Sequence, residues 1–148
     1  MTLTLRPQVE FRNAYKAFRA IGTRWSDNDL DGHVNNVVYY SWFDTAVNGL
    51  LIERGALDIH GGSVIGLVVE THCNYFSPIA FPDTITAGLR VAHRGTSSVR
   101  YEIGIFRCDD TTASAQGHFV HVYVNRASGR PVALPDALQR AVADLMIG

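Results

Sequence analysis

The sequence contains no long apolar run and no dense cluster of basic residues. Its longest apolar stretches, such as residues 64–69, are far shorter than the about 20 residues that a membrane-spanning helix needs. The first residues, MTLTLRPQVEFRN, lack the apolar core of a signal peptide, so we expect a cytoplasmic protein. The formal net charge is −1 and there is no Lys/Arg block. We therefore expect neither a nucleic acid nor a membrane among its partners.

Cysteine is scarce and has no metal-binding spacing. Cys73 and Cys108 stand alone, with neither a CxxC pair nor a Cys/His pattern, which is typical of reduced thiols in the cytosol. We interpret both as small side chains that are buried or half-buried. His118 and His121 lie three positions apart in a predicted strand, so they point to opposite faces and cannot share a metal ion. The sequence predicts neither a metal site nor a cofactor.

What the chain does have is the length and the hydropathy pattern of one α+β domain. It has 148 residues, of which 47% are hydrophobic and 18% charged, values typical of a single globular core. Alternation with a period of two predicts strands over residues 18–25, 64–76, 84–93, 99–106 and 113–125. Residues 95–98 (GTSS) are a plausible hairpin loop, which makes 84–93 and 99–106 antiparallel neighbours. The strand over 64–76 is expected to be more buried, with one face formed by Ile65, Leu67, Val69, Thr71, Cys73 and Tyr75.

Residues 36–54 predict the one long helix, and Gly55 is placed to end it. The helix must be buried on several sides, because its polar residues form only a narrow stripe of Ser41, Asp44, Thr45 and Asn48. A short amphipathic helix is expected after Pro135. These elements predict one curled antiparallel five-stranded sheet wrapped around the long helix. Since such a sheet leaves open edges, we expect at least a dimer joined edge to edge.

The segment from Asp27 to Asn36 carries the expected chemistry. It places three alternating aspartates, Gly32, His33 and two asparagines directly before the long helix, with Asn35 or Asn36 as the expected N-cap. A helix N-terminus offers unpaired N–H groups that can bind a carbonyl oxygen as it becomes negative. A nearby carboxylate can then attack the carbonyl carbon or activate a water molecule. This combination favours acyl transfer.

Two other interpretations compete for the same segment. One is a calcium loop, because positions one, three, five and six of the EF-hand pattern fall on Asp27, Asp29, Asp31 and Gly32. Position twelve argues against calcium, since it needs a bidentate Glu and falls on Val38. The other interpretation is structural, with aspartates that only cap a helix and solvate a turn.

The stretch DNDLDGHVNNVVYYSWFDTA resembles a known family. It looks like the signature of hotdog-fold acyl-CoA thioesterases of the 4-hydroxybenzoyl-CoA thioesterase type, whose pattern D-x-D-x-x-G precedes a hydrophobic helix. The resemblance continues through FPDTI (residues 81–85) and SSVRYE (residues 97–102), and runs from about residue 18 to residue 137. It implies a hotdog domain over residues 17–148, preceded by an N-terminal extension over residues 1–16.

The resemblance also assigns roles within the acidic segment. The second aspartate of the motif, Asp29, would carry the chemistry as nucleophile or general base, and the backbone N–H of Asn36 would be the oxyanion donor. Gly32 would let the backbone turn closely beside the thioester. His33 and Asn35 replace apolar or aromatic residues of some members; Asn35 is assigned to substrate binding. His33 could orient a water molecule, hydrogen-bond a carboxylate or merely pack.

Coenzyme A brings phosphates, which the resemblance places near the hairpin at Arg94, Ser97 and Ser98. Arg94 is the expected phosphate contact, and a solvated loop is the alternative. Asp44 is a weaker catalytic candidate. In this family the active sites lie between subunits of a homodimer or a dimer of dimers. Candidates for the wall supplied by a second subunit share one strand face: Glu70, His72 and Asn74.

The sequence thus predicts hydrolysis of an acyl-CoA thioester to a free acid and CoA. A hotdog dehydratase or hydratase that depends on His33 stays open, as does an acyl-CoA-binding domain without catalysis. Aromatic side chains could line an acyl pocket or belong to the core: Trp25, Tyr39, Tyr40, Trp42, Phe43, Tyr75 and Phe76.

Overall fold

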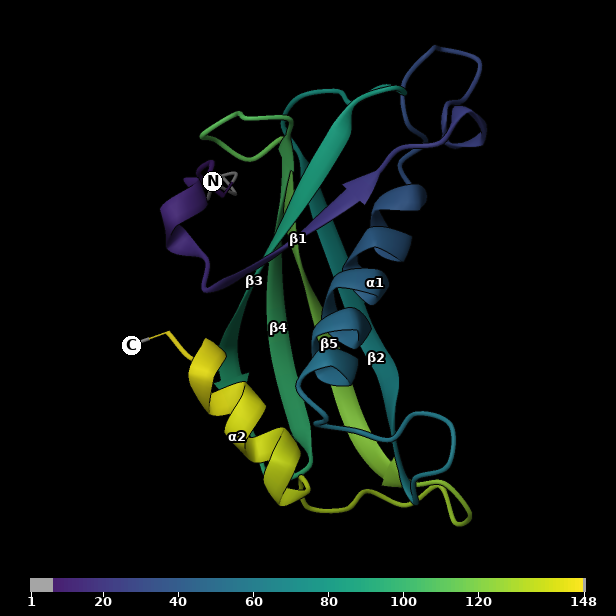
Figure 1. Cartoon of the computed structure of the whole chain (residues 1–148), viewed down its shortest axis with the longest axis vertical. Coiled ribbons are helices and arrows are strands. Elements are labelled where there is room, and N and C mark those ends of the chain that lie inside the picture. Colours follow the sequence, from purple (N-terminus) through teal and green to yellow (C-terminus); the bar gives the residue numbers. More distant parts are fainter. Residues whose placement is uncertain (1–6, 148) are drawn as a thin grey trace, which may run out of the picture.

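A computed structural model of the chain describes residues 7–147. One five-stranded antiparallel sheet, in the order β1-β3-β4-β5-β2, curls around the long helix α1 (Figure 1). The strands and helices are β1 (Ala17–Gly22), α1 (Val38–Glu53), β2 (Val64–Tyr75), β3 (Thr84–Arg94), β4 (Ser98–Arg107), β5 (Ala115–Asn125) and α2 (Asp136–Leu145). Two short 3-10 turns precede α1: η1 (Arg12–Ala14) and η2 (Trp25–Asp27). The predicted fold class is confirmed.

The concave face of the sheet and α1 form the core. In β4 the side chains of Val99, Tyr101, Ile103 and Ile105 point inward and are fully buried, as the alternation predicts. The β3–β4 pair is antiparallel as expected. Gly55, at φ +60°, ends α1, because a left-handed residue suits glycine at that position. The buried side chains of α1 extend from Tyr39 to Leu51, so the helix packs on the sheet along most of its length.

The prediction that residues 64–76 form the more buried strand is wrong. Within residues 7–147, β2 lies at the edge of the sheet and pairs only with β5, and its residues Leu67, Val68 and Val69 are between 46% and 60% exposed. A bulge at Val69 also reverses the alternation, because Val68 pairs with His121 whereas Glu70 pairs with Val120. Side chains before and after the bulge that were expected on one face therefore lie on opposite faces.

Residues 7–16 pack on the outer face of the sheet, the face opposite α1. The Glu10 N–H donates to Oε1 of Gln116 at 2.9 Å, and the side chain of Tyr15 lies against Gly104, where an added Cβ would come within 2.6 Å of the ring. The described part of the expected N-terminal extension is thus bonded to the domain, and residues 1–6 lie outside the described residues.

Other side chains follow the expectations in part. His118 and His121 point to opposite faces, as their spacing predicts. Cys73 is half-buried as expected, but Cys108 is exposed because it lies in the turn after β4. No helix in the described part of the chain is long and apolar enough to cross a membrane.

Candidate active site

The acidic segment is a tight turn between β1 and α1, ordered by its own backbone. The Asp29 N–H donates to the His33 carbonyl at 2.9 Å, and the Gly32 N–H donates to the Asp29 carbonyl at 3.0 Å. Gly32 sits at φ +80°, a left-handed conformation that costs a side-chain-bearing residue about 1–2 kcal/mol. The Val34 N–H ties the turn to the loop after β2 through the Ile79 carbonyl at 2.7 Å. Glycine at this position therefore fixes the shape of the turn.

The three aspartates of the turn have different surroundings. Asp27 is only 2% exposed and accepts hydrogen bonds from the backbone N–H and the guanidinium of Arg24, at 2.8 and 2.9 Å. Asp29 is exposed, and its Oδ1 accepts the Asp31 N–H at 2.9 Å. The second carboxylate oxygen of Asp29 has no partner among residues 7–147. Asp27 therefore holds the turn, whereas Asp29 keeps one oxygen open to a ligand.

The start of α1 differs from the prediction that Asn35 or Asn36 is its N-cap. The N-cap is Val37, whose own side chain forms no capping bond. A turn precedes the helix instead: the Val38 N–H donates to the Asn35 carbonyl at 3.0 Å, and the Val37 N–H donates to Oδ1 of Asn35 at 3.0 Å. The Asn35 side chain thus accepts the N–H of Val37, the N-cap itself, and no N–H of the first helical turn.

The backbone N–H of Asn36 has no acceptor within residues 7–147. The neighbouring N–H groups all have acceptors. The Asn35 N–H donates to the Asp27 carbonyl, and the Val38 N–H donates to the Asn35 carbonyl. The Val37 N–H donates to Oδ1 of Asn35. Asn36 is exposed, so its N–H can meet a ligand. One backbone donor at the helix start is thus left for a substrate oxygen.

This donor borders a pocket of about 300 Å³ between the start of α1 and the end of β2. His33, Val34 and Asn36 line one side of it, and the rest of the lining comes from Tyr39, Tyr75, Phe76, Ser77 and Pro78. The Tyr39 and Tyr75 rings meet edge to face with centroids 4.9 Å apart. His33 and Asn36 are therefore brought together, while the Asp29 carboxylate lies in the same turn but outside this lining.

The aromatic candidates divide between pocket and core. Tyr39, Tyr75 and Phe76 line the pocket. Trp42 and Phe43 are at most 3% exposed in the core, and the exposed Trp25 packs against Phe81 beside the turn. Ser77 and Pro78 were not predicted as site residues, because they reach the pocket through a long-range loop contact that leaves no periodic signal.

Arg94, Ser97 and Ser98 lie at the other end of the sheet. The register pairs Gly22, just before the acidic turn, with Thr84 at the start of β3, and Arg94 is the last residue of that strand. Ten strand steps of about 3.3 Å separate Thr84 from Arg94 by roughly 33 Å. In Figure 1 the start of α1 and the β3–β4 connection lie toward opposite ends of the sheet. Within one chain these residues do not meet the turn.

Glu70, His72 and Asn74 share a face, as expected, but it is the outer face. They pair with Val120, His118 and Gln116, and His118 Nε2 lies 2.7 Å from Oε2 of Glu70. In one chain they point away from the pocket. Asp44 does not line the pocket either, and its Oδ1 accepts the Asn48 side-chain amide at 2.8 Å on the exposed side of α1.

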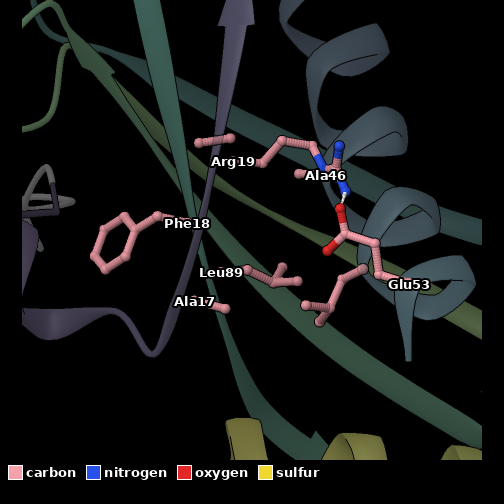
Figure 2. A pocket seen from close by; sticks show the side chains of 8 residues that line it. Ala17, Phe18, Arg19, Ala46, Glu53 and Leu89 are labelled. Atoms are coloured by element: carbon pink, nitrogen blue, oxygen red, sulfur yellow. Dashed lines mark hydrogen bonds and ion pairs between the residues drawn. The ribbon is translucent and has the colours of Figure 1, made fainter.

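A second hollow, between β1, β3 and α1, is shown in Figure 2. Its volume is about 20 Å³, room for one water molecule at most, and the Arg19–Glu53 ion pair closes it. Phe18 points away from the helix in the same view. This hollow is too small for a substrate.

Comparison with known proteins assigns the family. Residues 23–142 match the model of the thioesterase-like superfamily. The PA5185 protein from Pseudomonas aeruginosa strain PAO1 has a solved structure that is 57% identical, covers 94% of this chain and 97% of that one, and has a TM-score of 0.92. PA2801, a putative thioesterase from Pseudomonas aeruginosa, is 28% identical over 86% of this chain and 98% of its own, with a TM-score of 0.81.

A curated relative is the L-carnitine dehydrogenase/betainyl-CoA thioesterase of Agrobacterium fabrum, which is 26% identical over 79% of this chain. The chain spans only 24% of that longer protein. The match of the family model covers the acidic turn, the pocket and all strands after β1. The chain belongs to the thioesterase-like superfamily.

Proposed function

We propose that the protein hydrolyses an acyl-CoA thioester to a free acid and CoA. The observation that carries this proposal is the Asn36 N–H, which has no acceptor among residues 7–147 and borders the aromatic pocket. It follows a turn in which the Asp29 carboxylate is exposed. The thioester oxygen would accept the Asn36 N–H and become negative as the carbonyl carbon is attacked. The names of the thioesterase relatives support this reaction class.

Asp29 supplies the base or the nucleophile. As a base, its free oxygen takes a proton from water, the water oxygen bonds to the carbonyl carbon, and the carbon–sulfur bond breaks to release CoA, which takes up the proton. As a nucleophile, the same oxygen attacks the carbon directly and the carbon–sulfur bond breaks, so that CoA leaves as a thiolate. Water then hydrolyses the resulting anhydride, which frees the acid and the Asp29 carboxylate and supplies the proton that CoA takes up. A base and an oxyanion donor together supply roughly 10⁴–10⁷ in rate if their typical effects multiply.

The pocket favours a compact acyl group. Its volume of about 300 Å³ is at the lower limit of ligand pockets, and three of its lining residues are aromatic. A panel of short, long, branched, aromatic and betainyl thioesters would rank the acyl groups. We expect the compact ones to be hydrolysed fastest, as measured by kcat/KM from thiol release.

A second copy of the chain completes the site in this proposal. β2 is an open edge with three exposed apolar residues, Leu67, Val68 and Val69, a surface that favours strand pairing. Antiparallel pairing of two β2 strands would lay the hairpin end of one copy beside the acidic turn of the other. Arg94, Ser97 and Ser98 would then reach CoA phosphates from the second copy.

A hydratase or dehydratase is the second candidate, and one observation favours it. His33 lines the pocket, whereas the Asp29 carboxylate does not. Proton transfer to an enoyl or hydroxyacyl thioester would then depend on His33. Hydration of crotonyl-CoA without release of CoA would support this alternative.

The test compares native protein with Asp29→Asn, His33→Gln and Asp31→Asn in a thiol-release assay. Asp31 is the matched control, because it is exposed in the same turn and its side chain has no partner among the described residues. Asp29→Asn should lower kcat at least about a hundredfold, and Asp31→Asn by less than about threefold. Near-native hydrolysis by Asp29→Asn would refute the assignment, and tight thioester binding without thiol release would indicate a binding domain.

A further inference from the structure

Tyr75 forms an unusual link between the sheet and the start of α1. Its hydroxyl donates to the Asn36 carbonyl at 2.8 Å across 39 residues of sequence. Tyr75 is the last residue of β2, and its ring is held edge to face by Tyr39. A hydroxyl on a strand end therefore anchors the residue whose N–H is the proposed oxyanion donor.

The backbone on either side of Asn36 is fixed by further bonds. The peptide after it is held at its carbonyl by Tyr75 and at its N–H by Oδ1 of Asn35. The peptide before it is held at its carbonyl by the Val38 N–H at 3.0 Å. The Asn36 N–H is the one group of these two peptides without an acceptor in residues 7–147.

The helix alone holds Asn36 weakly. Besides Tyr75, the Asn36 carbonyl accepts only the Tyr39 N–H among the described residues, at 3.4 Å, which is long for a hydrogen bond. Burial raises the pKa of the Tyr75 hydroxyl above its ordinary range, so it stays protonated and can always donate. The strand end therefore supplies the stronger of the two contacts to this carbonyl.

We propose that Tyr75 is a positioning residue that aims the Asn36 N–H at the thioester oxygen; this role rests on the proposed hydrolysis. Catalytic donors act within narrow limits, and a displacement of about 1 Å can cost about a hundredfold in rate. Tyr75 touches the donor residue and acts through it. Because Tyr75 ends the open-edge strand β2, a partner bound to that edge would also stabilise the donor.

The test is Tyr75→Phe, which keeps the ring packed on Tyr39 and removes only the hydroxyl. We expect kcat for thioester hydrolysis to fall about tenfold, with KM changed less than about twofold, because the turn bonds of Asn35 remain and total loss of an oxyanion donor costs about 10²–10³. Tyr15→Phe is the control, because Tyr15 lies on the outer face, and it should keep native kcat.

A double-mutant cycle separates positioning from general stability. Asn36→Pro removes the N–H, so adding Tyr75→Phe to it should lower kcat less than about twofold further. If Tyr75→Phe lowered kcat a further tenfold in the Asn36→Pro protein, the two substitutions would act independently, and the positioning role of Tyr75 would be overturned. Native hydrolysis with undiminished kcat in Tyr75→Phe would overturn this role alone, whereas absence of hydrolysis by native protein would overturn the proposed function as well.

Discussion

Acidification should weaken the fold through one buried histidine, His121. The ring is 3% exposed on the concave face, where it packs against Phe119 with centroids 4.8 Å apart. Its Nδ1 lies 3.3 Å from the Tyr123 hydroxyl, and its Nε2 has no partner within residues 7–147. Burial lowers the pKa of His121 from 6.5 to about 4, because the charged imidazolium would lose its hydration.

The direction of the change in the free energy of unfolding with pH follows from proton binding at His121. Between pH 6.5 and 4 the unfolded chain binds a proton at this position and the folded chain does not, so the free energy of unfolding falls as the pH falls. The full difference is about 2.5 pH units at about 1.36 kcal/mol each, or about 3 kcal/mol. Between pH 7.5 and 5.0 the loss should be about 2 kcal/mol.

Urea unfolding of native protein and His121→Phe at pH 7.5 and 5.0, at one fixed protein concentration, measures this loss. The variant should lose about 2 kcal/mol less than native protein on acidification, since the other titrating groups cancel in the comparison. His60→Gln, which removes an exposed histidine, should follow the native curve. Equal losses in native protein and His121→Phe would refute the reasoning.

Three further substitutions test the fold and the edge. Asp27→Ala should lower the free energy of unfolding by about 1.5–3 kcal/mol in a denaturant titration, because it removes the charged acceptor of the Arg24 backbone N–H, while the freed Arg24 guanidinium is exposed to water; a loss below about 1 kcal/mol would contradict this. Gly104→Ala should loosen the packing of residues 7–16, because the alanine Cβ would come within 2.6 Å of the Tyr15 ring. Limited proteolysis should then cut the variant before residue 16 faster than native protein, and equal resistance in both would contradict this prediction. If two copies pair along β2 as proposed, Val69→Glu should lower the sedimentation coefficient by charging that edge, and an unchanged coefficient would contradict pairing along β2.

Local patterns predict most of the fold. The alternation of apolar and polar residues predicts β3 and β4 and their buried face correctly, because these strands lie inside the sheet with one face on the core. The same rule fails in β2, because the bulge at Val69 shifts the register and an edge strand is half exposed whatever its composition. Whether a strand is an edge depends on the whole sheet, which short-range periodicity does not contain.

Part of the candidate site could likewise be predicted from the sequence, and part could not. Gly32 and the turn around Asp29 follow from residue types that favour turns, and the aromatic residues Tyr39 and Tyr75 were expected as pocket candidates. The bond from Tyr75 to Asn36 could not be predicted, because it joins a strand end to a helix start across 39 residues. The hairpin motif alone does not predict that Arg94 lies far from the turn, because that prediction also requires the register of the strands.

The central claim is that the Asn36 backbone N–H stabilises the oxyanion, and a pair of substitutions tests it directly. Asn36 occupies the second position of the Asn35–Val38 turn, where proline is favoured, so Asn36→Pro removes the N–H with little strain. Asn36→Ala removes the side chain and keeps the N–H. In a thiol-release assay on folded variants, kcat should fall at least about a hundredfold in Asn36→Pro and less than about threefold in Asn36→Ala. Native-like kcat in Asn36→Pro, or equal losses in both variants, would contradict the account.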